Sequence, residues 1–228
     1  MKRVPLMLDT KRFAIHDGPG MRTTFFVKGC PLHCVWCHNP ESISPEKQVA
    51  RFRHLCQRCR KCTMDEATCP TRALKFYGKP ATVDELVKKA LEDKAFYDRT
   101  GGGVTISGGE PLFQPDFLME LLTGAKALGL HTAVETSGFG RAEDIRRIAP
   151  YVDLFLYDNK LTDPELHRRW TGAAPDIALR NLELLNELGA KVILRCPIIP
   201  GCNDTDAHFD AIAALAANEI EGVSGMYS

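Results

Sequence analysis

GCPLHCVWCHN, residues 29–39, is the stretch that decides the interpretation of this 228-residue chain, because it sets Cys30, Cys34 and Cys37 together in one loop. The apolar and β-branched run before it, residues 23–28, predicts the first strand of a sheet. Three cysteine thiolates can hold a 4Fe–4S cluster in which one iron keeps no protein ligand and stays open to a small molecule. The spacing therefore indicates an iron–sulfur site at the end of a strand.

Zinc is the alternative metal for this loop. A structural zinc site needs a fourth ligand, which His33 or His38 would supply. The chain has nine cysteines, an odd number, and seven of them lie between residues 30 and 69. Clustered cysteines at short spacing, in a chain with no secretory signal, are typical of metal ligands in a reducing cytoplasm. The spacing favours iron–sulfur over zinc.

Composition excludes several classes of function. Lys plus Arg and Asp plus Glu both number 29, so the formal net charge is zero. A neutral chain offers no broad basic footprint to nucleic acid or to an anionic membrane surface. No uncharged apolar run approaches the roughly 18 residues that a membrane span needs. We therefore expect a globular protein with no nucleic-acid or membrane partner.

The remainder of the chain alternates short apolar runs with amphipathic stretches, which is typical of βα units that build a parallel sheet. Capping and turn residues predict helices at 82–97, 115–129, from 163, at 175–188 and at 207–217. Six strands joined by crossovers result, in an α/β fold that places ligands at the carboxyl ends of its strands. The predicted strands are 23–28, 104–107, 131–136, 152–158, 191–196 and 220–227.

Three regions follow from this pattern. Residues 1–41 hold the first strand and the cysteine loop, residues 42–80 form an insertion without βα alternation, and residues 81–228 complete the sheet. The insertion contains Cys56, Cys59, Cys62 and Cys69 in the pattern C-x2-C-x2-C-x6-C-P.

The pattern of the insertion resembles the bacterial ferredoxin motif, whose last gap is normally three residues. We expect a ferredoxin-like insertion with a second 4Fe–4S cluster, with a four-cysteine zinc site as the alternative. The long gap makes Cys69 the weakest of the four predicted ligands. Cys196 and Cys202 are interpreted as ordinary thiols.

A second motif, SGGEP at residues 107–111, follows the next strand after the cysteine loop. Together with C-x3-C-x2-C, it resembles the radical S-adenosylmethionine (SAM) superfamily, in which a Gly-Gly-Glu turn contacts the methionine amino group of SAM. The match narrows to activating enzymes of glycyl radical enzymes, similar to pyruvate formate-lyase activating enzyme. The segments that carry this match are DGPGMR 17–22, CHN 37–39, GGGVT 101–105, ETSGF 135–139, DNK 158–160, LRCP 194–197 and PG 200–201.

The resemblance implies a partial (β/α)6 TIM-like barrel and a role for each matching residue. Trp36 and His38 are expected against the adenosyl group, and Gly109 with its neighbours at the methionine end. Asp158 and Lys160 match an Asp-x-Lys motif associated with the methionine carboxylate and a monovalent cation, and Arg195 offers a guanidinium to that carboxylate. The implied cofactor-binding set is Trp36, His38, Gly108, Gly109, Glu110, Glu135, Thr136, Asp158, Asn159, Lys160 and Arg195.

The implied reaction is reductive cleavage of SAM to a 5′-deoxyadenosyl radical, which takes a hydrogen atom from one glycine of a partner glycyl radical enzyme under anaerobic conditions. Asp17, Gly18 and Pro19 would face the partner, and a flavodoxin or ferredoxin would supply the electron. The family continues beyond the last strand with a Pro-Tyr-His stretch, whereas this chain ends at Ser228. We therefore expect a truncated carboxyl end, and the activity of the shortened chain stays open.

Two other functions compete with this one. The chain could be a radical SAM enzyme that modifies another peptide or a small molecule, although the segment DGPG argues against it. It could also be a non-catalytic or inactive truncated metal-binding protein in which both cysteine groups hold zinc. Metal analysis separates the last reading from the others, because two clusters correspond to about eight irons per chain.

Overall fold

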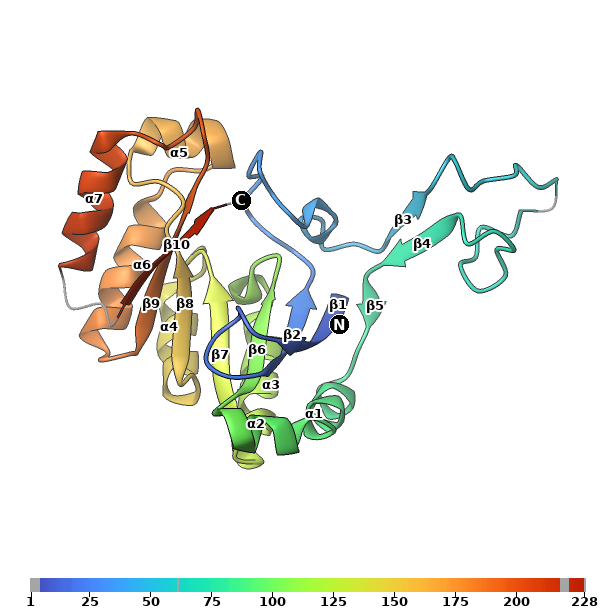
Figure 1. Ribbon diagram of the computed structural model, residues 1–228, viewed down its shortest axis with the longest axis horizontal. Helices are drawn as coiled ribbons and strands as arrows, with labels where there is room; N and C mark the ends of the chain where they lie inside the picture. The colour runs from blue at the N-terminus through green and yellow to red at the C-terminus, as the bar shows by residue number, and fades with distance from the viewer. Residues whose placement is uncertain (1–4, 61, 218–221, 228) are drawn as a thin grey trace.

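An eight-stranded, mostly parallel sheet forms the body of the protein (Figure 1). The computed structural model describes residues 5–60, 62–217 and 222–227. The strand order is β10-β9-β8-β7-β6-β2-β1-β5, and the first six strands in that order run parallel to one another. These six are β2 (Arg22–Val27), β6 (Gly103–Gly108), β7 (His131–Thr136), β8 (Leu154–Asp158), β9 (Val192–Ile198) and β10 (Gly222–Tyr227).

The six parallel strands confirm the six predicted from the sequence, with ends that differ by one or two residues. The strand predicted from residue 152 begins at Leu154. It starts later because the chain is still turning at Ala149–Tyr151, and the Asp153 carboxylate accepts a hydrogen bond from Thr132 N at 2.8 Å. Residues 220 and 221 of the last predicted strand lie outside the described residues.

Two antiparallel strands on the edge of the sheet were not expected. β1 (Leu6–Ala14) pairs with β2, and the two-residue strand β5 (Lys79–Pro80) pairs with β1. Because β1 covers the edge of β2, the first parallel strand is buried within the sheet rather than exposed at its border. β1 alternates half-buried and exposed residues, but its charged residues Asp9, Lys11 and Arg12 kept it from being predicted as a strand.

The helices cover one face of the sheet. The helix predicted at 82–97 is broken in two, at Glu92 and Asp93, and the short helix α4 was not expected because seven residues are too few to establish a helical period. The helices are α1 (Val83–Leu91), α2 (Lys94–Thr100), α3 (Pro115–Ala127), α4 (Ala142–Ile148), α5 (Pro164–Thr171), α6 (Asp176–Glu187) and α7 (Asp206–Ala216). Among these helices none combines the length and the apolar character that a bilayer crossing demands.

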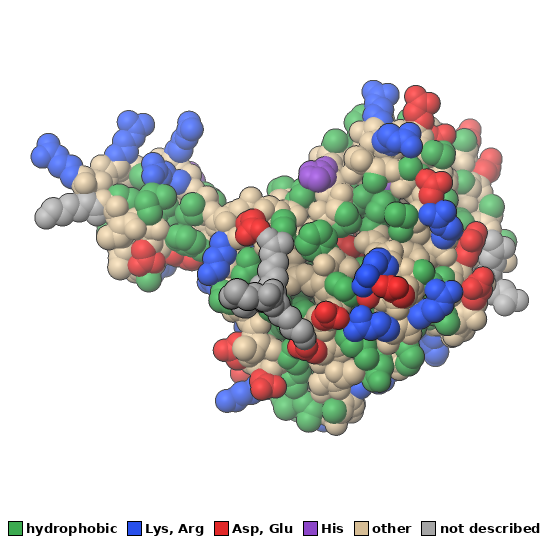
Figure 2. Space-filling model, turned by 180° about the vertical axis from the view of Figure 1, so that it is seen from behind, with side chains coloured by type: hydrophobic (Ala, Val, Ile, Leu, Met, Phe, Trp, Pro, Cys, Tyr) green, Lys and Arg blue, Asp and Glu red, His purple; other side chains and the backbone are tan. Residues whose placement is uncertain are grey.

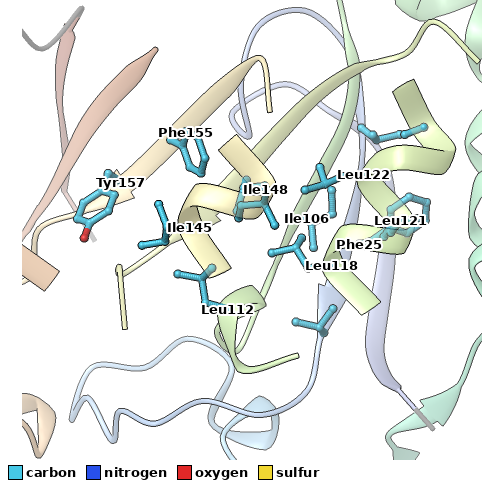
Figure 3. Close-up of a cluster of buried hydrophobic side chains, with 14 of the residues drawn as sticks. Phe25, Ile106, Leu112, Leu118, Leu121, Leu122, Ile145, Ile148, Phe155 and Tyr157 are labelled. Atoms are coloured by element: carbon cyan, nitrogen blue, oxygen red, sulfur yellow. The ribbon is translucent and has the colours of Figure 1, made fainter. Parts of the chain in front are cut away.

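Alternate strand residues separate the two faces of the sheet. One face packs its apolar side chains against α3, α4 and α6. Figure 3 shows the part of this core that involves α3 and α4. Among the described residues, the other face carries a small apolar cluster of Ala133, Leu154 and Leu156 with Ile193 packed against it, and the charged side chains of Glu135, Asp158 and Arg195. The labelled core residues are Phe25, Ile106, Leu112, Leu118, Leu121, Leu122, Ile145, Ile148, Phe155 and Tyr157.

Residues 42–80 include a separate two-stranded antiparallel sheet of β3 (Gln48–Arg51) and β4 (Leu74–Tyr77). Figure 1 shows this hairpin and the loop between its strands projecting from the body. The predicted cysteine-rich segment is therefore spatially distinct from the main sheet. It rejoins the body at β5, where Met7 pairs with Lys79.

The break between α1 and α2 is set by Asp93, a buried carboxylate. Its Oδ2 accepts hydrogen bonds from Arg12 Nε at 2.8 Å and from Thr23 Oγ1 at 3.0 Å. Tyr97 Oη donates to the same threonine hydroxyl at 2.6 Å. The hydrogen bond from Arg12 holds the pKa of Asp93 below its ordinary value, although burial opposes this shift. One side chain thus ties β1, β2 and the helices together.

Asp93→Asn should lower the free energy of unfolding at pH 7 by about 1 to 2 kcal/mol, because the charged acceptor of two side chains is lost. A depressed pKa in the folded state contributes stability that is present above the ordinary aspartate pKa and is lost as the pH falls through the folded pKa. The difference between wild type and variant should therefore shrink below about pH 4. Urea titrations between pH 3 and pH 7 measure it.

Asp98→Asn is the matched control, since Asp98 forms an exposed pair with Lys94 and should change stability by less than about 0.5 kcal/mol. If the difference in the free energy of unfolding between wild type and Asp93→Asn stayed constant from pH 3 to pH 7, the charged form of Asp93 would not be the stabilising one.

Candidate active site

Four charged side chains meet where β7, β8 and β9 end. Glu135 Oε1 lies 2.8 Å from Arg195 Nη1, and Lys160 Nζ lies 2.8 Å from Asp158 Oδ2. Arg195 Nε lies 3.7 Å from Asp158 Oδ1, which joins the two pairs. Asp158 Oδ1 is buried and accepts no hydrogen bond from any described residue. The ends of these three strands thus bring the four charged side chains together.

The pKa values in this charge cluster show how tightly the groups are coupled. Burial raises the pKa of Glu135, the neighbouring Asp158 raises it further, and Arg195 opposes both. Burial alone would lower the pKa of Lys160, but Asp158, the Cys34 sulfur and Glu135 outweigh it and raise the pKa well above the ordinary value. Lys160 is therefore a permanent cation beside the cysteine loop.

The loop that carries the three cysteines is fixed at its base and along its side. At the base, Gly29 N donates to Ser42 O at 2.7 Å and Cys30 N donates to Ile43 O at 3.0 Å. Along the side, His33 N donates to the carbonyl oxygen of Thr171 at 2.8 Å, at the end of α5. The backbone of the loop is held by hydrogen bonds to segments on both sides.

Two of the three thiols, Cys30 and Cys34, share a similar electrostatic environment. Burial raises the pKa of Cys30 to about 12, with Glu110, Cys34 and Cys37 adding to the effect. Burial also raises the pKa of Cys34, while Lys160 lowers it. Thiols of this kind do not ionise by themselves at neutral pH, so their thiolate form requires a metal cation. Three soft donors in a half-buried loop fit an iron–sulfur cluster.

No three His, Cys, Asp or Glu side chains within the described ranges converge closely enough to surround a single metal ion. A 4Fe–4S cluster places each cysteine on a different iron, so its donors are spaced more widely.

The Gly-Gly-Glu turn packs against the base of the cysteine loop. Gly109 N donates to Val27 O at 2.9 Å, and Glu110 N donates to Gly29 O at 2.8 Å. A Cβ atom on Gly109 would lie 2.3 Å from Gly29 O, and one on Gly108 would lie 2.3 Å from Val27 N. Glycine at both positions is explained by this backbone contact, which joins the two signature motifs.

Glu110 is a fully buried carboxylate whose hydrogen bonds stay inside the protein. One oxygen accepts from Leu112 N at 3.0 Å and Thr136 Oγ1 at 2.6 Å. The other accepts from Ser137 N at 2.8 Å and Ser137 Oγ at 2.6 Å. Burial raises its pKa, and these hydrogen bonds oppose the rise. The structure thus gives this carboxylate a clamping position between the turns that follow β6 and β7.

Three further residues of the implied cofactor-binding set, Glu135, Thr136 and Asn159, lie in different surroundings. Thr136 donates to Glu110 on the helix-covered side of the sheet, whereas Glu135 accepts from Ser107 Oγ at 2.7 Å on the other side, because neighbouring strand residues face opposite ways. Glu135 and Thr136, both in the implied cofactor-binding set, therefore face opposite sides of the sheet. Asn159 is buried, and its backbone N donates to Arg195 O at 2.9 Å.

Two residues of the cysteine loop were expected against the adenosyl group. Trp36 is half-buried and His38 is exposed.

The segment DGPG lies across the polar face of the sheet. Asp17 Oδ2 accepts from Thr24 Oγ1 at 2.6 Å, and Asp17 O accepts from Thr105 Oγ1 at 2.7 Å. Gly18 is half-buried and Pro19 is exposed. The segment thus presents an exposed proline beside an aspartate that is fixed in place.

Arg22 is the residue that fixes this segment, and the sequence analysis missed it. It is fully buried and donates to Pro19 O at 3.0 Å, to Thr105 Oγ1 at 2.7 Å and to Val104 O at 2.6 Å. Burial lowers its pKa to about 10. An arginine at the start of an otherwise apolar strand was the available signal, since a buried guanidinium needs several acceptors.

The four cysteines of the insertion line one cavity of about 380 Å3. Burial alone would raise the pKa of Cys69, but hydrogen bonds from Ala73, Thr71 and Leu74 outweigh it and lower the pKa. The pKa of Cys69 is thus shifted in the direction opposite to those of Cys30 and Cys34.

Comparison with known proteins identifies the family of this chain. The Radical SAM superfamily model matches residues 24–215. The (2S)-3-sulfopropanediol dehydratase activating enzyme of Klebsiella oxytoca is 37% identical over 95% of this chain and 78% of its own length. The trans-4-hydroxy-L-proline dehydratase activating enzyme of Clostridioides difficile is 38% identical over 96% of this chain and 83% of its own length.

Solved structures show the same fold. A domain of the pyruvate-formate lyase-activating enzyme from Bacteroides vulgatus superimposes with a TM-score of 0.51 at 30% identity, over 54% of this chain and 78% of that domain. Streptococcus suis SuiB bound to S-adenosylmethionine gives a TM-score of 0.59 at 15% identity, over 90% of this chain and 38% of that protein.

The chain therefore belongs to the radical SAM superfamily and, within it, to the activating enzymes of glycyl radical enzymes. Its class is that of oxidoreductases, and the non-catalytic alternative is not favoured. The family recognised from the two motifs is confirmed.

Glu110→Gln should lower the free energy of unfolding by about 2 kcal/mol, because each carboxylate oxygen accepts one backbone N–H and an amide nitrogen can replace neither. Guanidinium chloride titrations with an unchanged slope would measure this loss. The matched control is Glu143→Gln on the exposed side of α4, whose carboxylate pairs with the exposed Arg141 and which should change stability by less than about 0.5 kcal/mol. Equal stability of both variants would contradict the clamping position of Glu110.

Proposed function

We propose that this protein activates a partner glycyl radical enzyme, and that Cys30, Cys34 and Cys37 hold a catalytic 4Fe–4S cluster to which SAM binds. The observation that carries the proposal is the meeting of the cysteine loop, the Gly-Gly-Glu turn and the charge cluster of Glu135, Asp158, Lys160 and Arg195 at one edge of the sheet. When bound, the cluster and SAM supply the one-electron cleavage that yields a 5′-deoxyadenosyl radical for hydrogen abstraction from a glycine.

The charged residues at the strand ends suit the polar ends of SAM. Lys160 stays protonated and lies beside both Asp158 and Cys34, so it supplies a fixed positive charge near the methionine carboxylate. Arg195 adds a rigid donor fork that is preorganised by Glu135. Asp158 keeps one buried oxygen without a hydrogen bond from the described residues, and we assign it to the methionine end or to a monovalent cation.

The geometry supports separate tasks for the remaining predicted residues. Gly108, Gly109 and Glu110 fix the turn beneath the cluster loop, and Trp36 and His38 are assigned to the adenosyl group. The polar face of the sheet, with Asp17, Gly18 and Pro19 across it, is assigned to the partner's glycine loop. Six parallel strands with one polar face accord with a partial (β/α)6 barrel whose interior excludes water from the reacting groups.

The insertion is proposed to be ferredoxin-like and to hold a second 4Fe–4S cluster on Cys56, Cys59, Cys62 and Cys69. The cavity that these four cysteines line and the hydrogen bonds to Cys69 support this assignment. Its proposed task is to relay one electron from an external flavodoxin or ferredoxin to the catalytic cluster. Nine free thiols accord with a reducing cytoplasm as the compartment.

Production of 5′-deoxyadenosine from SAM tests both cluster assignments in one experiment. With dithionite as reductant, wild type and the triple variant Cys56→Ala/Cys59→Ala/Cys62→Ala should both form it, whereas Cys30→Ala/Cys34→Ala/Cys37→Ala should form none. With reduced flavodoxin as reductant, only the wild type should form it, because the relay is then required. Wild type should bind about eight irons and each variant about four.

Zinc in place of iron in the wild type would overturn the proposed activity. A triple variant of the insertion that fails with dithionite as completely as with flavodoxin would overturn the relay and leave the insertion a structural element.

A further inference from the structure

The neutral net charge of the chain is the sum of two opposite parts. Residues 42–80 contain nine Lys and Arg but three Asp and Glu, a net charge of +6. The other 189 residues contain 20 Lys and Arg but 26 Asp and Glu, a net charge of −6. The insertion that projects from the body in Figure 1 is therefore a basic element on an acidic body.

The arginines of the insertion are exposed. No ion pair to any of them occurs among the described residues, although Arg51 donates to Met64 Sδ at 3.2 Å. Cations of the body are commonly paired, as with Lys126 and Asp153 or Arg147 and Asp144. Figure 2 shows Lys and Arg side chains gathered on the projection. The exposed arginines are Arg51, Arg53, Arg58, Arg60 and Arg72.

Four of these five arginines lie at the cavity that the four cysteines line or near those cysteines in sequence. Arg51 and Arg58 belong to its lining, and Arg60 and Arg72 lie within three residues of Cys62 and Cys69. A macromolecule held by these arginines therefore lies directly over the cysteines. Unpaired surface charge of one sign steers association with a partner of the opposite sign.

We propose that the exposed arginines of the insertion form the docking surface for an acidic one-electron carrier protein of the flavodoxin or ferredoxin class. The inference rests on the second cluster proposed above. In the step it serves, the reduced carrier loses one electron and the cluster of the insertion gains it, with no bond made or broken. A carrier protein is favoured over nucleic acid because two of these arginines, Arg51 and Arg58, line the cavity of the cysteines.

The experiment measures the dissociation constant of an acidic flavodoxin, in its oxidised form, for the full-length holoprotein at low and at high ionic strength. The test variant is Arg53→Glu/Arg60→Glu, since neither residue lines the cysteine cavity. The matched control is Arg146→Glu/Arg180→Glu, two exposed arginines on α4 and α6. Both variants change the net charge by the same amount, so only the location of the change differs.

Wild-type binding should weaken as salt is added. At low salt, Arg53→Glu/Arg60→Glu should weaken binding by about tenfold or more, and Arg146→Glu/Arg180→Glu by less than about twofold. Both variants should keep the iron content of the wild type and its formation of 5′-deoxyadenosine with dithionite.

Equal weakening by both variants, or binding that is insensitive to salt, would overturn the docking surface. Normal binding of flavodoxin by Arg53→Glu/Arg60→Glu would also overturn it if this variant instead lost self-association in sedimentation, which would assign the arginines to a contact between copies of this chain. The same holds if the variant lost affinity for a single-stranded oligonucleotide, which would assign them to nucleic acid. Failure of the proposed function is distinguishable, because it appears as absence of 5′-deoxyadenosine from the wild type with dithionite, whatever the binding measurement shows.

Discussion

The site depends on a backbone contact between two turns. The carbonyl oxygen of Gly29, at the base of the cysteine loop, accepts a hydrogen bond from Glu110 N, and Gly109 packs against it with no room for a Cβ atom. The carboxylate of Glu110 then reaches the turn after β7 through Thr136 and Ser137. These hydrogen bonds connect the ends of three neighbouring strands. The cysteine loop, the Gly-Gly-Glu turn and the charge cluster therefore keep fixed positions relative to one another.

The electrostatics of the site follow from this arrangement. Buried carboxylates and thiols have raised pKa values, while Lys160 remains charged because several acidic neighbours surround it. Such a site favours ligands that bring their own positive charge or that compensate the thiolates, as iron does. The same coupling holds Arg195 between two carboxylates, which orients its guanidinium before a substrate arrives.

Much of this could be predicted from the sequence, because its motifs lie at strand ends. Alternation of apolar runs located all six parallel strands, and the parallel topology then brought residues 135, 158, 160 and 195 together. The role of Glu110 could not be predicted, because the four donors to its carboxylate come from two different turns. Arg22 was missed for a similar reason: its acceptors lie on three separate segments. Whole-chain charge also hid the basic insertion, since an acidic body cancels it.

The central claim is that SAM binds directly to a three-cysteine cluster at the ends of these strands. Electron paramagnetic resonance of the reduced, iron-reconstituted Cys56→Ala/Cys59→Ala/Cys62→Ala variant tests it most directly, because that variant should keep only the catalytic cluster. Addition of SAM should change the g-values of the 4Fe–4S signal, since a small molecule joins the iron that lacks a protein ligand. A signal that is identical with and without SAM would contradict the account.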